Sequence, residues 1–278
     1  MKELPISSSD ELVVPEQRGG VLILTLNRPA LRNAINVAMI EALSLQLERA
    51  EKRPEVRCIV LTGSGSAFCS GGDVRSMGAN TRTRTTPDAT TQARAKETLR
   101  EAQRRTALRL YQSSKPTLAS LPGAAVGAGL SWALACDLRI MSETASLATG
   151  FAKLGLSGDH GGLFFLNRLV GRAKTLELFL LSRKLPAKEA LALGLTNWVC
   201  PPTDLFRETI ALATQLAEGA PLAHRFIKEN LTLAEQTENA EAYMDKEAER
   251  QIAAMQTEDF REAVLAFSEK RAPRFSGK

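Results

Sequence analysis

The sequence predicts a mixed α/β (α+β) fold, in which repeated ββα units stack as a right-handed coil and a C-terminal helical region follows. An apolar, β-like run followed by a glycine-rich loop and a helical pattern occurs at residues 57–73, again at 116–137, and more weakly at 138–171. From about residue 201 onward, the pattern is almost wholly helical. We therefore expect a ββα core at 1–200 and a helical region at 201–278.

The individual elements follow from periodicity and from turn residues. The first two apolar runs lie on either side of a turn that contains Gly19 and Gly20, which favours a β-hairpin. In chain order we expect strands at 11–14, 21–26, 57–62 and 116–121. Helices are expected at 36–52, 92–113, 174–182, 187–193, 204–218, 222–234, 239–255 and 260–270. A stretch rich in Thr, Arg and Pro at 78–91 predicts a mobile surface loop.

Composition excludes several classes of protein. The 278 residues can bury one sizeable core, and no apolar run approaches the length needed to span a bilayer. No signal-peptide pattern precedes the hairpin, so we expect a cytoplasmic location. Four widely spaced cysteines and two histidines make disulfides and a metal site unexpected. The net charge of +5 is compatible with a polyanionic ligand and equally with surface charge that aids solubility.

The two glycine-rich loops are the most informative feature. They read AFCSGGD at residues 67–73 and GAAVGAG at 123–129, and each follows a strand-like run and leads into a helical pattern. Backbone N–H groups at such junctions lack partners within the helix, so they can bind an anion. The amides of Gly72 and Ala128 are therefore predicted to form an oxyanion hole, which glycine permits because it has no Cβ. The alternative is a pair of tight turns without a chemical role.

The motifs around these loops resemble those of the crotonase (enoyl-CoA hydratase/isomerase) superfamily. The second loop continues as GAGLSWALACD at 127–137, and TGFAKLGLSGDHGG follows at 149–162. The resemblance extends from NRP at 27–29 to FSEKR at 267–271. It implies a spiral ββα fold, an acyl-CoA substrate, and assembly as trimers or dimers of trimers through residues 201–278. Hydratases of this family carry two catalytic glutamates, and the matching positions here are Ser131 and Phe151.

Asp159 is the candidate general base. The resemblance places it where dienoyl-CoA isomerases and the isomerase of the phenylacetate pathway have a working aspartate. We expect an apolar pocket of Phe151, Leu156 and Trp132 to raise its basicity by desolvation. The alternative is that Asp159 caps the helix that opens near Gly161.

Two neighbouring polar residues have open roles. His160 could orient substrate or shuttle a proton, but adjacent loop residues usually point apart, which favours a structural or surface histidine. Ser131 is a catalytic candidate because its hydroxyl could hold water or a substrate oxygen, although it cannot act as a base unaided. It could equally be a small residue that only makes room.

The resemblance also implies contacts with coenzyme A, which enters as part of the thioester substrate, with no permanently bound cofactor. Basic residues are expected near its phosphates, and Phe267 near its adenine. Asp73 could instead cap the following helix. The full set of predicted substrate and coenzyme A contacts is Arg28, Ala67, Ser70, Gly72, Asp73, Arg75, Phe151, His160, Phe267 and Lys270. The acyl group is expected among residues 78–91, the region of Trp132, and the C-terminal helices.

A basic helix invites a nucleic-acid interpretation, which the pattern does not favour. Six basic residues at 94–109 are interleaved with Glu97 and Glu101, and no aromatic residue stands among the arginines for base stacking. A solvated helix face explains this spacing.

The sequence is thus interpreted as an acyl-CoA enzyme that shifts a double bond through a thioester enolate. Three alternatives stay open: a hydratase with atypical catalytic residues, a hydrolase or dehalogenase that uses Asp159 as nucleophile, and a non-catalytic acyl-CoA binder. The dehalogenase histidine has no counterpart near Leu99.

Overall fold

The computed structural model describes residues 11–74 and 88–278, and a six-stranded sheet organises them. A hairpin of β1 (Val13–Arg18) and β2 (Val21–Leu26) forms one edge. The sheet continues in parallel from β2 through β3 (Cys58–Gly63), β5 (Thr117–Leu121), β7 (Leu138–Ser142) and β10 (Trp198–Cys200). The hairpin is confirmed, although β1 continues through the expected turn to Arg18 and leaves a two-residue connection.

A second, smaller sheet carries the repeat. It contains β4 (Ala67–Cys69), β6 (Ala124–Val126), β8 (Ser146–Ala148) and β9 (Leu185–Pro186), of which the first three are parallel. Each of β3, β5 and β7 therefore passes from the large sheet into the next strand of the small one. A helix follows the second and third pairs, at α5 (Ala128–Ala135) and α6 (Gly162–Leu181). The predicted coil of ββα units is confirmed.

Strand alternation separates two layers of core. Leu22, Leu24 and Leu26 face the main core, which contains α1 (Val37–Lys52), whereas Val21 and Ile23 face α8 (Leu205–Glu218). Helix α1 begins where the Asn36 side chain accepts a hydrogen bond from the Met39 amide, as expected for an N-cap. Helix α8 covers the opposite face of the large sheet, so the first helix after residue 201 belongs to the core.

The helices around α5 differ from the prediction in two places. The helix expected at 92–113 consists of α3 (Ala89–Gln103), a π-helical turn η2 (Arg104–Leu108) and α4 (Arg109–Tyr111). Helix α6 begins twelve residues before the expected residue 174 and runs to Leu181. Its backbone leaves helical geometry at Gly171 (φ 72°, ψ 172°), and this break divides the pattern into two shorter stretches.

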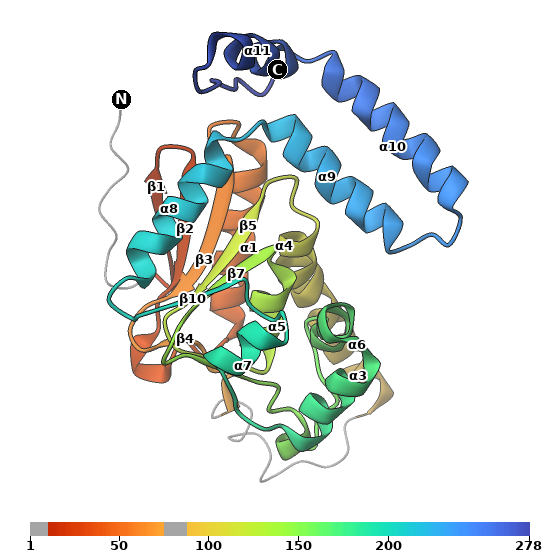
Figure 1. Cartoon of the computed structure of the whole chain (residues 1–278). Coiled ribbons are helices and arrows are strands. Elements are labelled where there is room, and N and C mark those ends of the chain that lie inside the picture. Colours follow the sequence, from red (N-terminus) through yellow and green to blue (C-terminus); the bar gives the residue numbers. More distant parts are fainter. Residues whose placement is uncertain (1–10, 75–87) are drawn as a thin grey trace.

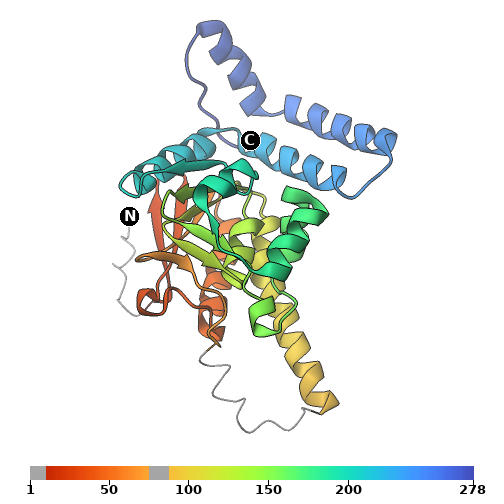
Figure 2. The same ribbon diagram turned by 60° about the horizontal axis from the view of Figure 1, so that its bottom comes forward.

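The remaining helices lie where the sequence predicts them. They are α7 (Ala187–Ala192), α9 (Pro221–Ala234), α10 (Ala240–Met255) and α11 (Glu258–Glu269). Figures 1 and 2 show α10 and α11 beyond the sheet and its covering helices, as an arm that follows α9. Helices α9 and α10 bury no residue fully, and large apolar side chains such as Ile227, Leu231 and Met244 are exposed.

Within the described ranges, no helix has the length and apolarity needed to cross a membrane, and no group of three or more His, Cys, Asp or Glu side chains could hold a metal ion. The four cysteines are free thiols, three of them buried. Most of the loop expected at 78–91 lies outside the described residues, and Ala89 already belongs to α3.

Candidate active site

The two glycine loops meet because their strands are neighbours. β4 and β6 pair in parallel, so both chains leave the small sheet at the same edge. An ideal Cβ on Gly71 lies 2.9 Å from the Val126 carbonyl oxygen, and one on Gly129 lies 2.6 Å from Sγ of Cys69. Both distances are shorter than any real Cβ tolerates. The contact between the loops therefore depends on glycine.

Within the part of the chain that the structure describes, the amides of Gly72 and Ala128 have no protein acceptor. Beside the first loop, the Ile35 amide donates to the Gly71 carbonyl, and the Asp73 amide donates to the Ile35 carbonyl. The Gly72 amide, which lies between them in the chain, takes part in neither bond. Ala128 is the first residue of α5, where an amide has no partner within the helix. Neither amide donates to an acceptor anywhere in residues 11–74 and 88–278. Two adjoining loops thus each contribute an unpaired N–H.

Asp159 lies in a loop that several positive φ angles shape. Gly158 (φ 120°), His160 (φ 47°) and Gly161 (φ 74°) surround it between the short helix η3 (Ala152–Leu154) and α6. Its main-chain carbonyl accepts from the Gly162 amide at 3.1 Å and from Oγ of Ser131 at 3.0 Å. These bonds hold the loop against the start of α5.

The Asp159 carboxyl group is partly buried, and one of its oxygens has no hydrogen-bond partner among the described residues. This atom is Oδ1, and burial raises the pKa of the group to about 6. The N-cap of α6 is Gly161, with no side-chain capping bond, so the alternative role of Asp159 as the cap of this helix is wrong. A desolvated carboxylate that keeps an unused acceptor is the arrangement expected of a general base.

Phe151 lies between the second glycine loop and the Asp159 loop. Its ring stacks on Phe179 with centroids 5.9 Å apart, and an ideal Cβ on Gly127 lies 3.8 Å from its Cζ atom. An ideal Cβ on Gly158 would contact both rings. Leu156, in contrast, is half exposed, so the structure does not place it as an apolar wall.

Trp132 and His160 form a buried pair, so of the structural and surface roles favoured for His160 the structure shows the structural one. His160 is 3% exposed, and its Nδ1 accepts a hydrogen bond from Nε1 of Trp132 at 3.1 Å. Because indole nitrogen only donates, Nδ1 carries no proton and the hydrogen resides on Nε2. Burial lowers the pKa of His160 to about 4. The ring is therefore neutral near pH 7.

Ser131 has a positioning contact. Its side chain is buried, and the hydroxyl lies within hydrogen-bonding distance of the Gly127 and Asp159 carbonyls. An ideal Cβ on Gly162 would lie 2.5 Å from the hydroxyl, so there is no room for a bound water on that side. These contacts show a role that neither prediction named, in which the Ser131 hydroxyl ties α5 to the Asp159 loop.

Arg28 bonds to protein rather than standing open to a phosphate. One terminal nitrogen lies 3.1 Å from Oδ2 of Asp73, and the other donates to the Ala34 carbonyl at 2.5 Å. Both charged side chains are mostly buried. The two residues predicted separately as coenzyme A contacts are thus an ion pair, which ties the chain after β2 to the first glycine loop.

The other predicted coenzyme A contacts do not gather in one place. Ala67 is buried, and its carbonyl accepts from the Asn33 side chain, while the hydroxyl of Ser70 donates to the Leu31 carbonyl. Phe267 is 88% exposed, and the exposed Lys270 follows the end of α11. Figure 1 shows α11 at the opposite end of the molecule from β4. Arg75 lies outside the described residues.

Sequence reasoning missed Asn33. This fully buried residue has φ 57°, and its amide group donates to the carbonyls of Ser64, Ala67 and Phe68 while accepting from the Arg28 amide. It therefore fixes the strand that leads to the first glycine loop. Asparagine tolerates left-handed backbone better than most residues, and this is the one signal the sequence offered.

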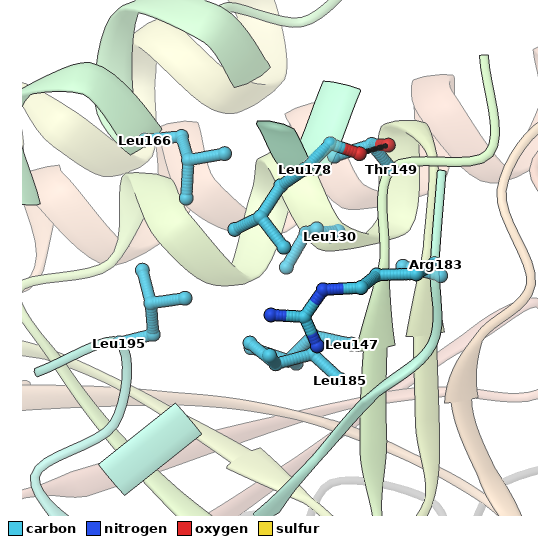
Figure 3. A pocket seen from close by; sticks show the side chains of 9 residues that line it. Leu130, Leu147, Thr149, Leu166, Leu178, Arg183, Leu185 and Leu195 are labelled. Atoms are coloured by element: carbon cyan, nitrogen blue, oxygen red, sulfur yellow. Dashed lines mark hydrogen bonds between the residues drawn. The ribbon is translucent and has the colours of Figure 1, made fainter. Parts of the chain in front are cut away.

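A small internal cavity lies apart from these residues. Figure 3 shows it among leucines of α5, α6 and β8, with the Arg183 side chain reaching in. Its volume of about 10 Å³ is no more than one water molecule needs. This cavity is a gap in the core and cannot hold a substrate.

The spiral of ββα units and the paired glycine loops define a crotonase-type, acyl-CoA-transforming enzyme. The family model described as enoyl-CoA hydratase/isomerase matches residues 16–278, and the chain belongs to this family. A Rhodobacter capsulatus protein named "Probable enoyl-CoA hydratase" is 38% identical over 262 residues, which cover 93% of this chain and 95% of the relative. The 1,2-epoxyphenylacetyl-CoA isomerase of Escherichia coli is 33% identical, covering 96% and 99%.

Solved structures agree with this assignment. The crystal structure of an enoyl-CoA hydratase from Polaromonas sp. JS666 superimposes with a TM-score of 0.85 at 32% identity, covering 95% of this chain and 99% of that one. The predicted crotonase fold is confirmed by this match.

Proposed function

We propose that the protein is an enoyl-CoA isomerase that uses Asp159 as its single acid–base group. The observation that carries this proposal is the Asp159 carboxyl group, which has a buried oxygen without a partner in residues 11–74 and 88–278 and a pKa raised to about 6. The two positions that match the hydratase glutamates hold Ser131 and Phe151. One carboxylate suffices to move a proton between two carbons of the same substrate.

In the proposed reaction, the thioester oxygen of a 3-enoyl-CoA binds to the amides of Gly72 and Ala128. Asp159 takes a proton from C2, and the electron pair moves into the carbonyl, which gives a dienolate. The two amides stabilise its oxygen by about 3 to 4 kcal/mol each. The protonated carboxyl then returns the proton to C4, and the double bond shifts to C2–C3.

The environment of Asp159 supports the acid and the base role in turn. A pKa of about 6 leaves the carboxylate ionised near pH 7, yet more basic than an exposed aspartate. The stacked rings of Phe151 and Phe179 beside the loop reduce the access of water. Ser131 holds the Asp159 carbonyl and so positions the carboxyl group.

Hydration is the second candidate, because several relatives are named enoyl-CoA hydratases. Addition of water requires a group that activates it in addition to the oxyanion donors. The hydroxyl of Ser131 lies against main-chain carbonyls and is not a base. We therefore expect hydration to be slow compared with isomerisation.

Substrate binding and assembly complete the proposal. Coenzyme A is proposed to bind near Ala67, Ser70 and Arg75, with no permanently bound cofactor. We propose a homotrimer or a homohexamer, in which residues 201–278 form the subunit contacts, a cytoplasmic location, and no role in nucleic-acid binding. The apolar residues exposed on α9 and α10 support a covered face there.

The test compares 3-hexenoyl-CoA isomerisation with crotonyl-CoA hydration, for the natural chain and for Asp159→Asn. We expect isomerisation to dominate and to disappear in the variant. Robust hydration that survives Asp159→Asn contradicts the proposal. Release of free coenzyme A with an acyl group trapped on Asp159 identifies a hydrolase, and tight thioester binding without any conversion identifies a non-catalytic binder.

A further inference from the structure

A second cavity, of about 380 Å³, opens beside the Asp159 loop. One face of the helical segment α3–η2–α4 forms one side, and the start of α6 forms the other. Its lining residues are Arg100, Gln103, Arg104, Ala107, Leu108, Tyr111, His160, Gly161, Phe164 and Phe165. Two of these lining residues, His160 and Gly161, directly follow Asp159 in the chain. Its volume lies in the range of small-ligand sites.

Three aromatic rings form the floor of this cavity. Tyr111 lies 5.9 Å from Phe164 and 5.3 Å from Phe165, and the two phenylalanine rings meet edge to face at 5.3 Å. The Tyr111 hydroxyl donates to Glu235, which fixes its ring. Phe164 stays 44% exposed despite the guanidinium of Arg168 over its face. Such a cluster can accept one more ring with offset or edge-to-face geometry.

Hydrogen-bond donors complete the lining. Nδ1 of His160 accepts from Trp132, so Nε2 carries a hydrogen, and this N–H has no acceptor among the described residues. Arg104 is exposed and has no ion pair within the same residues, whereas Arg100 pairs with Glu97 at 2.8 Å. Gln103 adds an amide. Three donors, from His160, Arg104 and Gln103, therefore remain available to a ligand that fills the apolar part.

The π-helical turn η2 produces this arrangement. Its wider turn directs Thr106 and Ala107 into the core, where Oγ1 of Thr106 lies 3.3 Å from Nδ1 of His160. Arg104 and Leu108, at the two ends of the turn, both line the cavity. Single π turns inside α-helices are frequent at functional sites.

We propose that this cavity holds the far end of the acyl group, and that the substrates are thioesters of aromatic or cyclic acids with a hydrogen-bond acceptor beyond the ring. The ring contacts Tyr111, Phe164 and Phe165, and the acceptor bonds to Arg104 and to Nε2–H of His160. The inference rests on the proposed function, because the thioester must lie at the Gly72 and Ala128 amides while the ring enters the cavity.

Calorimetry on the full chain tests this inference, because it measures the affinity for thioesters that the proposed reaction cannot convert. The probes are three saturated thioesters: 4-(4-carboxyphenyl)butanoyl-CoA, 4-phenylbutanoyl-CoA and hexanoyl-CoA. We expect affinity to fall in that order. Arg104→Ala weakens the carboxyphenyl probe by about fivefold to tenfold and leaves the other two unchanged. Arg94→Ala, on the same basic helix but outside the cavity, is the matched control and changes none.

Filling the cavity is an independent check. Leu108 is partly exposed, so Leu108→Trp is compatible with folding. It weakens both aryl probes by more than about tenfold and leaves hexanoyl-CoA bound. Equal affinity of all three probes, or an equal loss for all of them in Arg104→Ala, overturns the inference. Aryl binding that persists without any isomerisation of 3-enoyl thioesters refutes the proposed function alone.

Discussion

Two aspartates that follow glycines near the paired loops have opposite environments. Asp73 follows Gly72, and its carboxylate lies 3.1 Å from the Arg28 guanidinium. Asp159 follows Gly158, and its buried Oδ1 has no partner in the part of the chain that the structure describes. Burial with a counter-charge produces a structural link, whereas burial without one raises the pKa and so produces a more basic carboxylate. The residue type alone therefore does not reveal which of the two aspartates has a chemical role.

The largest effect is expected from Asp159→Asn, which removes the proposed base and keeps the shape of the side chain. Isomerisation of 3-hexenoyl-CoA is expected to fall by about 10²- to 10⁴-fold in kcat. Affinity for hexanoyl-CoA is expected to stay unchanged, since the amides of Gly72 and Ala128 are intact. Steady-state kinetics and calorimetry measure the two quantities. A loss confined to KM contradicts the assignment.

Ala128→Pro removes one proposed oxyanion donor without lengthening or breaking α5. Proline suits the first residue of a helix, where the N–H has no helical partner. We expect kcat to fall by about 10²- to 10³-fold. Ala240→Pro, at the exposed first residue of α10, is the matched control and leaves kcat unchanged. Full activity of Ala128→Pro is incompatible with an oxyanion hole at this amide.

Asp159→Asn is also expected to stabilise the folded chain, and the gain depends on pH. The pKa of Asp159 is raised from 3.8 to about 6, so between these values the folded state binds more protons than the unfolded state. The natural chain thus loses stability as pH rises through this window. We expect the variant to be more stable by about 2 kcal/mol at pH 7, with no difference below about pH 3.8.

Urea unfolding across this pH range measures the difference. His160, whose pKa is lowered to about 4, titrates with the opposite sign, but it is present in both chains and cancels. Equal stability of the two chains at pH 7 shows that Asp159 has a partner in solution.

The smallest effect is expected from Asp73→Asn, which breaks the ion pair with Arg28. We expect about 1 kcal/mol lower free energy of unfolding and a change in kcat of less than about tenfold. Asp204→Asn breaks the more exposed pair with Arg207 and serves as the comparison, with no measurable loss. A loss of activity as large as that of Asp159→Asn removes the distinction between the two aspartates.

Most of the fold could be predicted from the chain because its signals are local. Alternating apolar residues, turn glycines and the Asn36 cap lie within a few residues of the elements they define. One exception is the first half of α6, where the break at Gly171 divided the helical pattern. The expectation that residues 201–278 mediate trimer formation stays a prediction, although α8 itself covers the sheet.

By itself the sequence determined the repeat of ββα units and the two glycine loops, and its family resemblance predicted Asp159 as the carboxylate of the site. Only the tertiary structure decided that Arg28 neutralises Asp73, that His160 is buried against Trp132, and that Phe267 lies far from the loops in a single chain. The physical reason is the separation along the chain between the residues that set each feature. Backbone patterns depend on neighbours along the chain, whereas the desolvation and pairing of a charge depend on residues that only folding brings together.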